Sequence, residues 1–246
     1  MRLDKYLSEA GEGSRSQVKE LIRNGLVSVN GEKAARPEYK VEEGDQVSVS
    51  GRQICLSQTE YWMLYKPTGC VSATEDLHLP TVLQLLPPDA RKDLFPVGRL
   101  DRDTEGLMLL TNDGALAHRL LSPRKHVDKT YYAVVRGVMN EETIKAFQEG
   151  LDIGDDKKTL PAKLRILSVE QPWDGKAENT ETEIEITIRE GRFHQVKRMC
   201  AAVGCQVLYL KRLSMGSLKL DERLIPGESR LLTEDEIDAL KEETGC

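Results

Sequence analysis

The chain of 246 residues lacks two features that would define its class at once, clustered cysteines and long apolar segments. Its five cysteines are scattered and odd in number, and they form neither a CxxC pair nor a Cys/His cluster with zinc spacing. This pattern argues against a disulfide scaffold and predicts reduced thiols in the cytoplasm. No apolar run exceeds five residues and the first residues lack the apolar core of a signal peptide, so we expect neither a membrane span nor secretion.

Aromatic residues are few, at 5% of the chain, whereas charged residues make up 31%, which is typical of a globular protein. The formal net charge of −6 argues at first sight against an anionic partner. However, residues 221–246 carry nine acids and three bases, which accounts for the whole excess. Residues 189–212 carry six bases and one acid, and residues 91–136 carry nine bases and six acids. These basic segments favour an anionic partner, although ordinary solvated charge would explain each one taken alone.

Residues 1–52 show the pattern of a small separate module. Ser14 is a suitable N-cap for a helix over residues 15–24. Asn30-Gly31 is typical of a tight hairpin turn, and the alternation at residues 47–49 predicts a strand. The module is therefore expected to combine helices with a small sheet.

The helix expected over residues 15–24 has one apolar face and one basic face. Its apolar residues are Val18, Leu21 and Ile22. The basic residues recur every four positions, so they share the opposite face: Arg15, Lys19 and Arg23.

A polar joint with no evident structure, residues 53–60, precedes a larger body that begins at Tyr61. Apolar runs at residues 61–65 and 107–110 predict buried strands, and the alternation at residues 183–188 predicts a half-exposed one. Helices are expected over residues 115–121, from Phe193 to Gly204, and after the capping box at residues 233–236. Strands outnumber helices and short turns link them, so the predicted fold class is α+β, with a mixed, mainly antiparallel sheet and packed helices.

The segment from Gly98 to Gly106 is the most informative part of the chain. It places Asp101 between Arg99 and Arg102 at a glycine-bounded turn, just before an apolar strand. Neighbouring cations favour the ionised form of a carboxylate, and catalytic groups often lie on loops braced by a rigid element. A solvated surface turn would have the same pattern, so this segment alone does not establish a catalytic site.

Other motifs accompany this segment, and together they resemble two known families. Residues 98–107 followed by 111–114 are similar to the catalytic motif of pseudouridine synthases, and the remaining motifs occur in the expected order at residues 66–69, 129–131 and 191–199. Residues 1–52 resemble the S4 RNA-binding domain, through residues 2–7, 14–15, 21–22, 29–31 and 44–45. The whole chain resembles the RsuA family of ribosomal RNA pseudouridine synthases. This resemblance implies an S4-like RNA-binding domain over residues 1–58 and a synthase domain over residues 59–246.

The resemblance also implies roles for individual residues. Asp101 would be the essential carboxylate, acting either as nucleophile or as base at the sugar, and Lys197 would pair with it. Tyr131 would stack on the target base, although core packing in a strand is a competing role. Arg99 would fill the space that the base vacates, or else contact phosphate. The reaction moves the uracil ring from an N-glycosidic to a carbon linkage without redox change, so we expect no cofactor and no metal.

Further RNA contacts are expected from basic residues of both domains: Arg15, Lys19, Arg23, Arg192 and Arg198. We expect His194 to contact RNA or to pack rather than to catalyse.

The sequence Gln195-Val196-Lys197 resembles the small-subunit type of synthase. The expected partner is therefore 16S ribosomal RNA, at position 516, or a small-subunit assembly intermediate. We expect a monomer with no membrane partner. The alternatives are a 23S ribosomal RNA synthase of the same family, and a non-catalytic S4-type RNA-binding or ribosome-assembly protein. Glycoside hydrolysis would need a second placed carboxylate, for which Asp103 is the near candidate.

Overall fold

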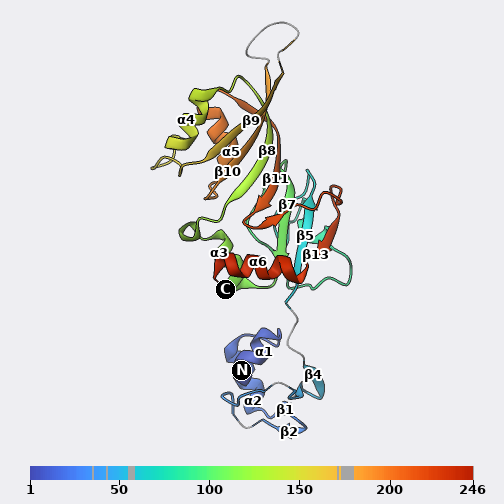
Figure 1. Cartoon of the computed structure of the whole chain (residues 1–246). Helices are drawn as coiled ribbons and strands as arrows, with labels where there is room; N and C mark the ends of the chain where they lie inside the picture. The colour runs from blue at the N-terminus through green and yellow to red at the C-terminus, as the bar shows by residue number, and fades with distance from the viewer. Residues whose placement is uncertain (35, 43, 55–58, 171, 173–179, 246) are drawn as a thin grey trace. The chain divides into compact units, whose positions relative to one another are not determined.

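The structure, a computed structural model, describes residues 1–34, 36–42, 44–54, 59–170, 172 and 180–245. The chain forms two compact units, Met1–Thr59 and Glu60–Cys246, here called the N-terminal and C-terminal units (Figure 1). The sequence predicted a domain boundary between residues 58 and 59. In the structure the chain passes from one unit to the other between residues 59 and 60. Each unit has its own apolar core.

The N-terminal unit packs two short helices on a four-stranded antiparallel sheet. The helices are α1 (Leu3–Glu9) and α2 (Arg15–Arg23). The sheet has the order β2-β1-β3-β4, with β1 (Val27–Val29), β2 (Glu32–Lys33), β3 (Val47–Val49) and β4 (Arg52–Ile54). Val18 and Ile22 of α2 are buried in the core beside Val47, as the helical pattern predicted.

Local sequence explains where α2 begins and where the first hairpin turns. Ser14 caps α2, since its hydroxyl accepts the backbone N–H of Gln17 and the Gln17 side chain accepts the backbone N–H of Ser14 at 2.8 Å. Asn30 and Gly31 have φ angles of 53° and 83°, which is the left-handed geometry of a two-residue hairpin turn.

Part of the joint predicted at residues 53–60 belongs instead to the small sheet. Gln53 and Ile54 lie in β4, and Ile54 is buried in the N-terminal core, so the expectation of no structure there was wrong. A strand of three residues with one buried side chain carries too little alternation to be recognised in sequence. Residues 55–58 lie outside the described part of the chain.

The C-terminal unit is built around a large sheet with the order β13-β5-β7-β11-β8-β10-β9. Parallel pairing joins β7 to β11, whereas the other strand pairs described in this sheet are antiparallel. This confirms the expected mixed, mainly antiparallel sheet. The strands are β5 (Tyr61–Lys66), β6 (Phe95–Pro96), β7 (Glu105–Thr111), β8 (Lys129–Arg136), β9 (Lys163–Glu170), β10 (Glu181–Ile188), β11 (Gln206–Met215), β12 (Leu218–Lys219) and β13 (Ser229–Leu231).

The α-helices of this unit are α3 (Gly114–Leu121), α4 (Glu141–Glu149), α5 (Gln195–Ala202) and α6 (Glu234–Thr244). Two 3₁₀ turns, η1 (Val82–Leu85) and η2 (Pro123–Lys125), lie in the connections. The sequence did not predict α4, whose cap is the Asn140 side chain. Helix α5 begins two residues later than expected, since His194 has a left-handed φ of 48°. No helix within the described residues is long and apolar enough to cross a membrane.

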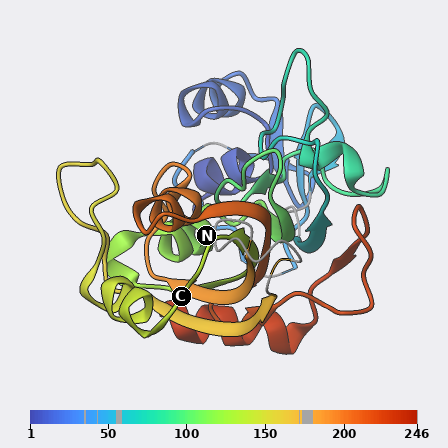
Figure 2. The same cartoon turned by 90° about the horizontal axis from the view of Figure 1, so that it is seen from above.

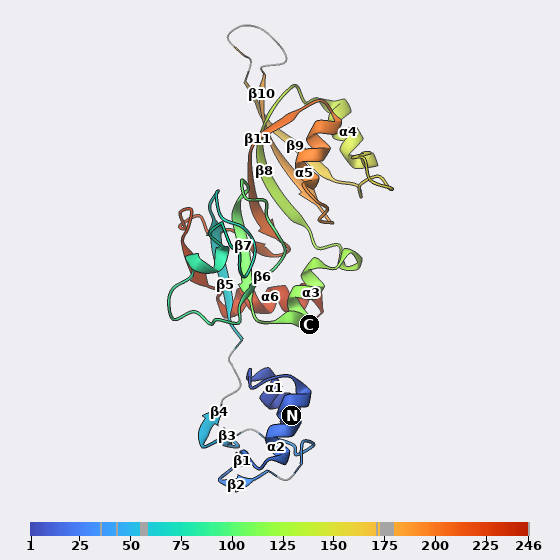
Figure 3. The same cartoon turned by 180° about the vertical axis from the view of Figure 1, so that it is seen from behind.

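Helices α4 and α5 pack on one face of the large sheet, near one end, and α3 and α6 pack on the other face, near the other end. Successive residues of β7 alternate between two cores: Met108 and Leu110 pack with Met199 of α5, whereas Leu107 and Leu109 pack with Leu240 of α6. Figure 3 shows α4 and α5 near β8–β10, and α3 and α6 at the other end of the sheet. The view from above in Figure 2 shows the orange helix α5 and the red helix α6 on opposite sides of the strands.

The parallel contact between β7 and β11 depends on a glycine. Gly106 pairs with Arg212 and has a φ of 101°, which side chains rarely allow. A Cβ atom at this position would meet the backbone of Arg212, with the nearest atom its carbonyl oxygen. The buried Arg212 guanidinium also donates to the carbonyl of Leu107 at 2.7 Å. The strands therefore meet backbone to backbone at this point.

We expect Gly106→Ala to destabilise the C-terminal unit by more than about 2 kcal/mol, because the added methyl combines overpacking against backbone with a strained φ. Gly114→Ala is the matched control, since a Cβ at Gly114 meets no atom within 4 Å. It should change the unfolding free energy by less than about 0.5 kcal/mol. Urea unfolding of both variants measures the difference, and equal stabilities would contradict the account of this strand contact.

Candidate active site

The loop between β6 and β7 carries Asp101 and is fixed at both ends by short polar contacts. Within the loop, the backbone N–H of Thr104 donates to the carbonyl of Asp101 at 3.1 Å. Before it, the Ser72 hydroxyl donates to the carbonyl of Leu100 and accepts from its N–H, at 2.8 and 3.0 Å. Both Ser72 and Thr104 are buried. The backbone next to Asp101 is therefore held to the segment that follows β5.

Lys66, at the end of β5, ties the same loop together from inside the protein. Its side chain is fully buried, and its ammonium donates to the carbonyls of Pro67, Arg102 and Thr104 at 3.0, 3.3 and 2.8 Å. Burial lowers the pKa of Lys66 below its usual value. Carbonyl oxygens are the usual partners by which a buried ammonium recovers its lost hydration. Lys66 thus joins the first motif of the domain to the Asp101 loop.

Lys197 of α5 reaches this loop and contacts two carboxylates. Its Nζ lies 3.1 Å from Oδ2 of Asp101 and 2.6 Å from Oδ1 of Asp103. The side chain of Asp101 is 23% exposed and that of Lys197 25%, whereas that of Asp103 is 71% exposed. Nε2 of His194 lies 3.5 Å from the other oxygen of Asp101. Residues far apart in sequence thus form one charged cluster at the protein surface.

The protonation of this cluster follows from its contacts. Burial lowers the pKa of Lys197, but hydrogen bonds to Asp103 and Asp101 outweigh it, so the pKa lies above its usual value. The hydrogen bond from Lys197 holds the pKa of Asp103 below its usual range. At neutral pH, Lys197 is therefore a cation and Asp103 an anion.

A tight turn before α5 sets the direction of Lys197. The side chain of Gln195 is buried and accepts the backbone N–H of Arg192 at 2.9 Å. Helix α5 begins at Gln195, so Lys197 lies in its first turn, while Val196 and Met199 are buried in the core. The apolar residues fix the helix, and Lys197 faces the Asp101 loop as a consequence.

Tyr131 lies in β8 and is 8% exposed. It belongs to the same core cluster as Leu100 and Val196, which are the chain neighbours of Asp101 and Lys197. Tyr132 lies on the opposite face of the strand, where its ring meets that of Tyr209 edge to face. The alternation therefore puts Tyr131 on the face of the sheet that carries the charged cluster.

The basic residues expected to bind RNA differ in their surroundings. Arg99 is exposed, and so are Arg15 and Arg23 of the N-terminal unit, while Lys19 is partly buried. Arg192 and Arg198 are engaged within the protein.

Both of these arginines hold the segment after α4. The guanidinium of Arg192 donates to the carbonyls of Lys157 and Lys158 at 2.7 and 2.8 Å. That of Arg198 donates to the carbonyl of Ile153, and both arginines pair with Asp155. A phosphate would have to compete with these bonds, so their RNA contacts stay predictions.

Two contacts were not predicted from the sequence, the Lys66 tie and the short Asp103–Lys197 pair. Lys66 was recognised as part of a motif, but a lysine beside a proline carries no sign of burial. Asp103 was considered only as a second acid for hydrolysis. The loop partners of Lys66, Arg102 and Thr104, lie at least 36 positions away in sequence. The partner of Asp103, Lys197, is 94 positions away, so no local pattern reveals these contacts.

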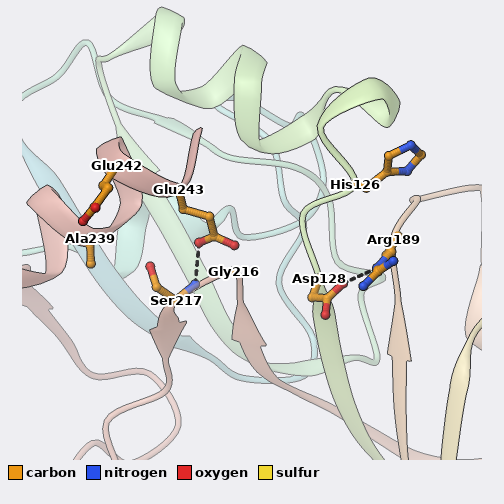
Figure 4. Close-up of a pocket in the computed structure, with 8 residues that line it drawn as sticks. All are labelled: His126, Asp128, Arg189, Gly216, Ser217, Ala239, Glu242 and Glu243. Carbon is orange, nitrogen blue, oxygen red and sulfur yellow. Dashed lines mark hydrogen bonds and ion pairs between the residues drawn. The ribbon is translucent and has the colours of Figure 1, made fainter. Parts of the chain in front are cut away.

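Within the described residues, no group of three or more histidine, cysteine, aspartate or glutamate side chains is arranged to hold a metal ion. A separate hollow lies beside the end of α6 and contains none of the predicted site residues (Figure 4). Asp128 pairs with Arg189 there at 2.7 Å, and the Ser217 N–H donates to Glu243 at 2.7 Å. The second of these contacts joins α6 to the turn between β11 and β12.

Replacement of Lys66 by methionine tests the contact between Lys66 and the Asp101 loop. Lys66→Met removes one donor from three carbonyls, of which those of Arg102 and Pro67 also accept from the Gly69 N–H and the Cys70 thiol. We expect a loss of about 1–3 kcal/mol in unfolding free energy and reduced turnover, because the Asp101 loop loosens. Lys211→Met is the control, since Lys211 is partly exposed and its ammonium lies over the Tyr65 ring at 4.8 Å. Urea unfolding and turnover are measured for both, and equal effects would refute a special role for Lys66.

The sequence and structure match known proteins over both units. A family model described as RNA pseudouridylate synthase matches residues 60–202, and an S4 domain model matches residues 1–47. A solved structure titled as a pseudouridylate synthase is 38% identical, with a TM-score of 0.67, and the match covers 98% of this chain and 99% of that one.

Curated relatives align over nearly their whole length. An uncharacterized RNA pseudouridine synthase of Bacillus subtilis is 46% identical over 98% of this chain and 99% of the relative. Ribosomal small subunit pseudouridine synthase A of Vibrio parahaemolyticus is 39% identical over 98% and 99%. Ribosomal large subunit pseudouridine synthase B of Bacillus subtilis is 38% identical over 98% and 95%. The resemblance and fold class derived from the sequence are thereby confirmed, and the chain belongs to the RNA pseudouridylate synthase family, as an RsuA-type member with an N-terminal S4 domain.

Proposed function

We propose that this protein converts a specific uridine of ribosomal RNA to pseudouridine, with Asp101 as the essential carboxylate. The observation that carries the proposal is the 3.1 Å contact between Asp101 and Lys197 on a braced loop. A cation fixed beside a partly buried carboxylate holds it in one orientation. Both proposed roles of Asp101, nucleophile or base at the sugar, need the ionised form.

Asp101 is a better candidate than Asp103 for physical reasons. The side chain of Asp103 is 71% exposed, so solvent leaves it free to reorient. That of Asp101 is 23% exposed and lies between Lys197 and His194. A group that reacts with a sugar atom must be held near its attack geometry, and of these two carboxylates Asp101 is the one with contacts on both sides.

The proposed reaction balances without any other reactant. The bond from N1 to C1′ of the target uridine breaks, and a bond from C5 to C1′ forms after the uracil ring turns. The proton on C5 is lost, and N1 gains one. Asp101 either attacks C1′ as N1 leaves and is displaced when C5 bonds to C1′, or removes a sugar proton as the ring detaches and returns it when C5 bonds to C1′. Lys197 offsets the negative charge of Asp101 and keeps it fixed.

The target nucleotide must leave its stack to reach Asp101, at a cost of a few kcal/mol. Tyr131 is proposed to stack on the detached base, which its position on the Asp101 face of the sheet supports. Arg99 is exposed on the same loop as Asp101, so it can occupy the vacated space or contact a phosphate. Arg15, Lys19 and Arg23 of the N-terminal unit are proposed to hold the RNA backbone.

The proposed substrate is 16S ribosomal RNA, free or in a small-subunit assembly intermediate. Relatives named as small subunit synthases at 38–39% identity support it, as does the Gln195-Val196-Lys197 sequence. A relative named as a large subunit synthase at 38% identity makes 23S ribosomal RNA the alternative. We propose that the protein acts in the cytoplasm as a monomer. Pseudouridine mapping across both RNAs, in cells with and without the gene, tests the substrate. Loss of a 23S site alone would refute the 16S proposal.

Asparagine substitutions at the two aspartates separate the proposed catalytic carboxylate from its neighbour. Asp101→Asn should lower pseudouridine formation roughly 10³-fold or more, because an amide can act neither as nucleophile nor as base. Asp103→Asn should lower it less than about tenfold, since an exposed ion pair contributes at most about 1 kcal/mol. Turnover of the folded, purified variants on an RNA fragment gives the comparison. Retained activity in Asp101→Asn would refute the assignment.

Neutralising the basic face of α2 tests the RNA-binding role of the S4 domain in the full chain. Substitution of Arg15, Lys19 and Arg23 together by alanine should weaken RNA affinity and flatten its salt dependence. Each phosphate that is no longer neutralised should change the slope of log Kd against log salt by about 0.7–0.9. Lys145→Ala on α4, an exposed lysine outside the proposed set, is the control. An unchanged salt slope in the triple variant would show that this face does not hold RNA.

A further inference from the structure

The residue before His194 is a phenylalanine whose side chain is not buried. Phe193 is 76% exposed, although it is large and apolar. Its ring stacks on the imidazole of His194, with centroids 3.8 Å apart and planes 19° from parallel. The other face of the ring is open to solvent, because a ring covered on both faces could not keep this exposure.

The aromatic pair is held in place by the backbone around it. His194 has the left-handed φ of 48°, and its carbonyl accepts the backbone N–H of Arg198 at 2.9 Å. The Arg198 guanidinium donates to the carbonyl of Phe193 at 3.2 Å. These bonds hold the backbone that carries the two rings, and the rings stack on each other. A pair that is already stacked loses little conformational entropy when a ligand stacks on it.

The pair also lies directly beside the charged cluster. Nε2 of His194 is 3.5 Å from Oδ1 of Asp101. The imidazole therefore contacts the Asp101 carboxylate through Nε2 and the Phe193 ring through its face, and the outer face of the Phe193 ring meets solvent. The surrounding segment, residues 189–212, carries six bases and one acid. A flat apolar face beside the Asp101 cluster suits a nucleobase, since every base has a π-face. A protein partner would gain little from a single ring.

We propose that the outer face of Phe193 is the stacking site for an unpaired base next to the target uridine in the RNA. The proposal rests on the function proposed above and adds a substrate contact to it. The site binds and orients the RNA chain and takes no part in the chemistry. The flanking base, stacked on Phe193, keeps the local strand open while the target nucleotide lies at Asp101.

A double-mutant cycle between protein and RNA tests this contact. Phe193→Leu keeps an apolar side chain but removes the aromatic face, so the affinity for an RNA fragment should fall about 5- to 100-fold. RNA carrying an abasic nucleotide beside the target should lose the same factor with the wild-type protein. Combining the two changes should cost little more than either alone. Ile225→Ala, at an apolar side chain that is 63% exposed in a distant loop, is the control and should change nothing.

Two outcomes would overturn the proposal. One is an unchanged RNA affinity in the Phe193→Leu variant. The other is a loss of affinity in this variant that is the same for intact RNA and for RNA made abasic at either nucleotide flanking the target. Phe193→Trp gives a readout independent of catalysis, because a stacked base should quench the new indole beyond any change seen in the wild-type protein with its two tryptophans. If the wild-type protein forms no pseudouridine while the quenching and the cycle persist, the proposed function fails and the stacking site stands.

Discussion

The backbone contact between β7 and β11 at Gly106 and Arg212 is the constraint on which the site depends. It joins the half of the sheet formed by β13, β5 and β7 to the half formed by β11, β8, β10 and β9. Because these two strands run parallel, the segments that precede them lie at the same end of the two strands. One of those segments carries Asp101, and the other carries α5 with Lys197. The proposed catalytic pair is therefore assembled across the seam between two antiparallel halves.

The loop that carries Asp101 is held by hydrogen bonds to its backbone carbonyls. Lys66 and Ser72 bond to backbone carbonyls of the Asp101 loop, and they leave the carboxylate of Asp101 for Lys197 and His194. Buried donors to carbonyls contribute most when removal of the donor would leave those carbonyls unsatisfied. The loop can thus present the Asp101 side chain at a partly exposed position without losing its shape.

Charge is divided unevenly along the chain, and the division agrees with the geometry. The acidic residues of the last segment lie mainly on and before α6, where Asp221 and Glu236 pair with Arg230. In segment 189–212, Lys197 lies in the charged cluster, and Arg198 pairs with Asp155. An overall charge of −6 is therefore compatible with an RNA partner, because a phosphate chain responds to the local potential more than to the total.

Several parts of the fold follow from the sequence, because their determinants are local. The Ser14 capping box, the Asn30-Gly31 turn and the alternation in β10 each involve residues within a few positions of one another. Helix α4 was missed because its apolar face is short, and β4 was missed because a strand of three residues offers no period to detect. The late start of α5 comes from the left-handed His194, a conformation that a non-glycine residue reveals only in the structure.

Linear motifs were enough to establish the family, the α+β class and the candidacy of Asp101, Tyr131 and Lys197. Three-dimensional packing was needed to show that Lys197 lies between two carboxylates, that Lys66 is buried under the Asp101 loop, and that Arg192 and Arg198 hold another segment of the protein. The same packing leaves Phe193 exposed, whereas Gln195 and Val196 at the start of α5 are buried. These properties depend on contacts between segments tens of residues apart, and such contacts arise only when apolar faces have fixed the strands and helices against one another.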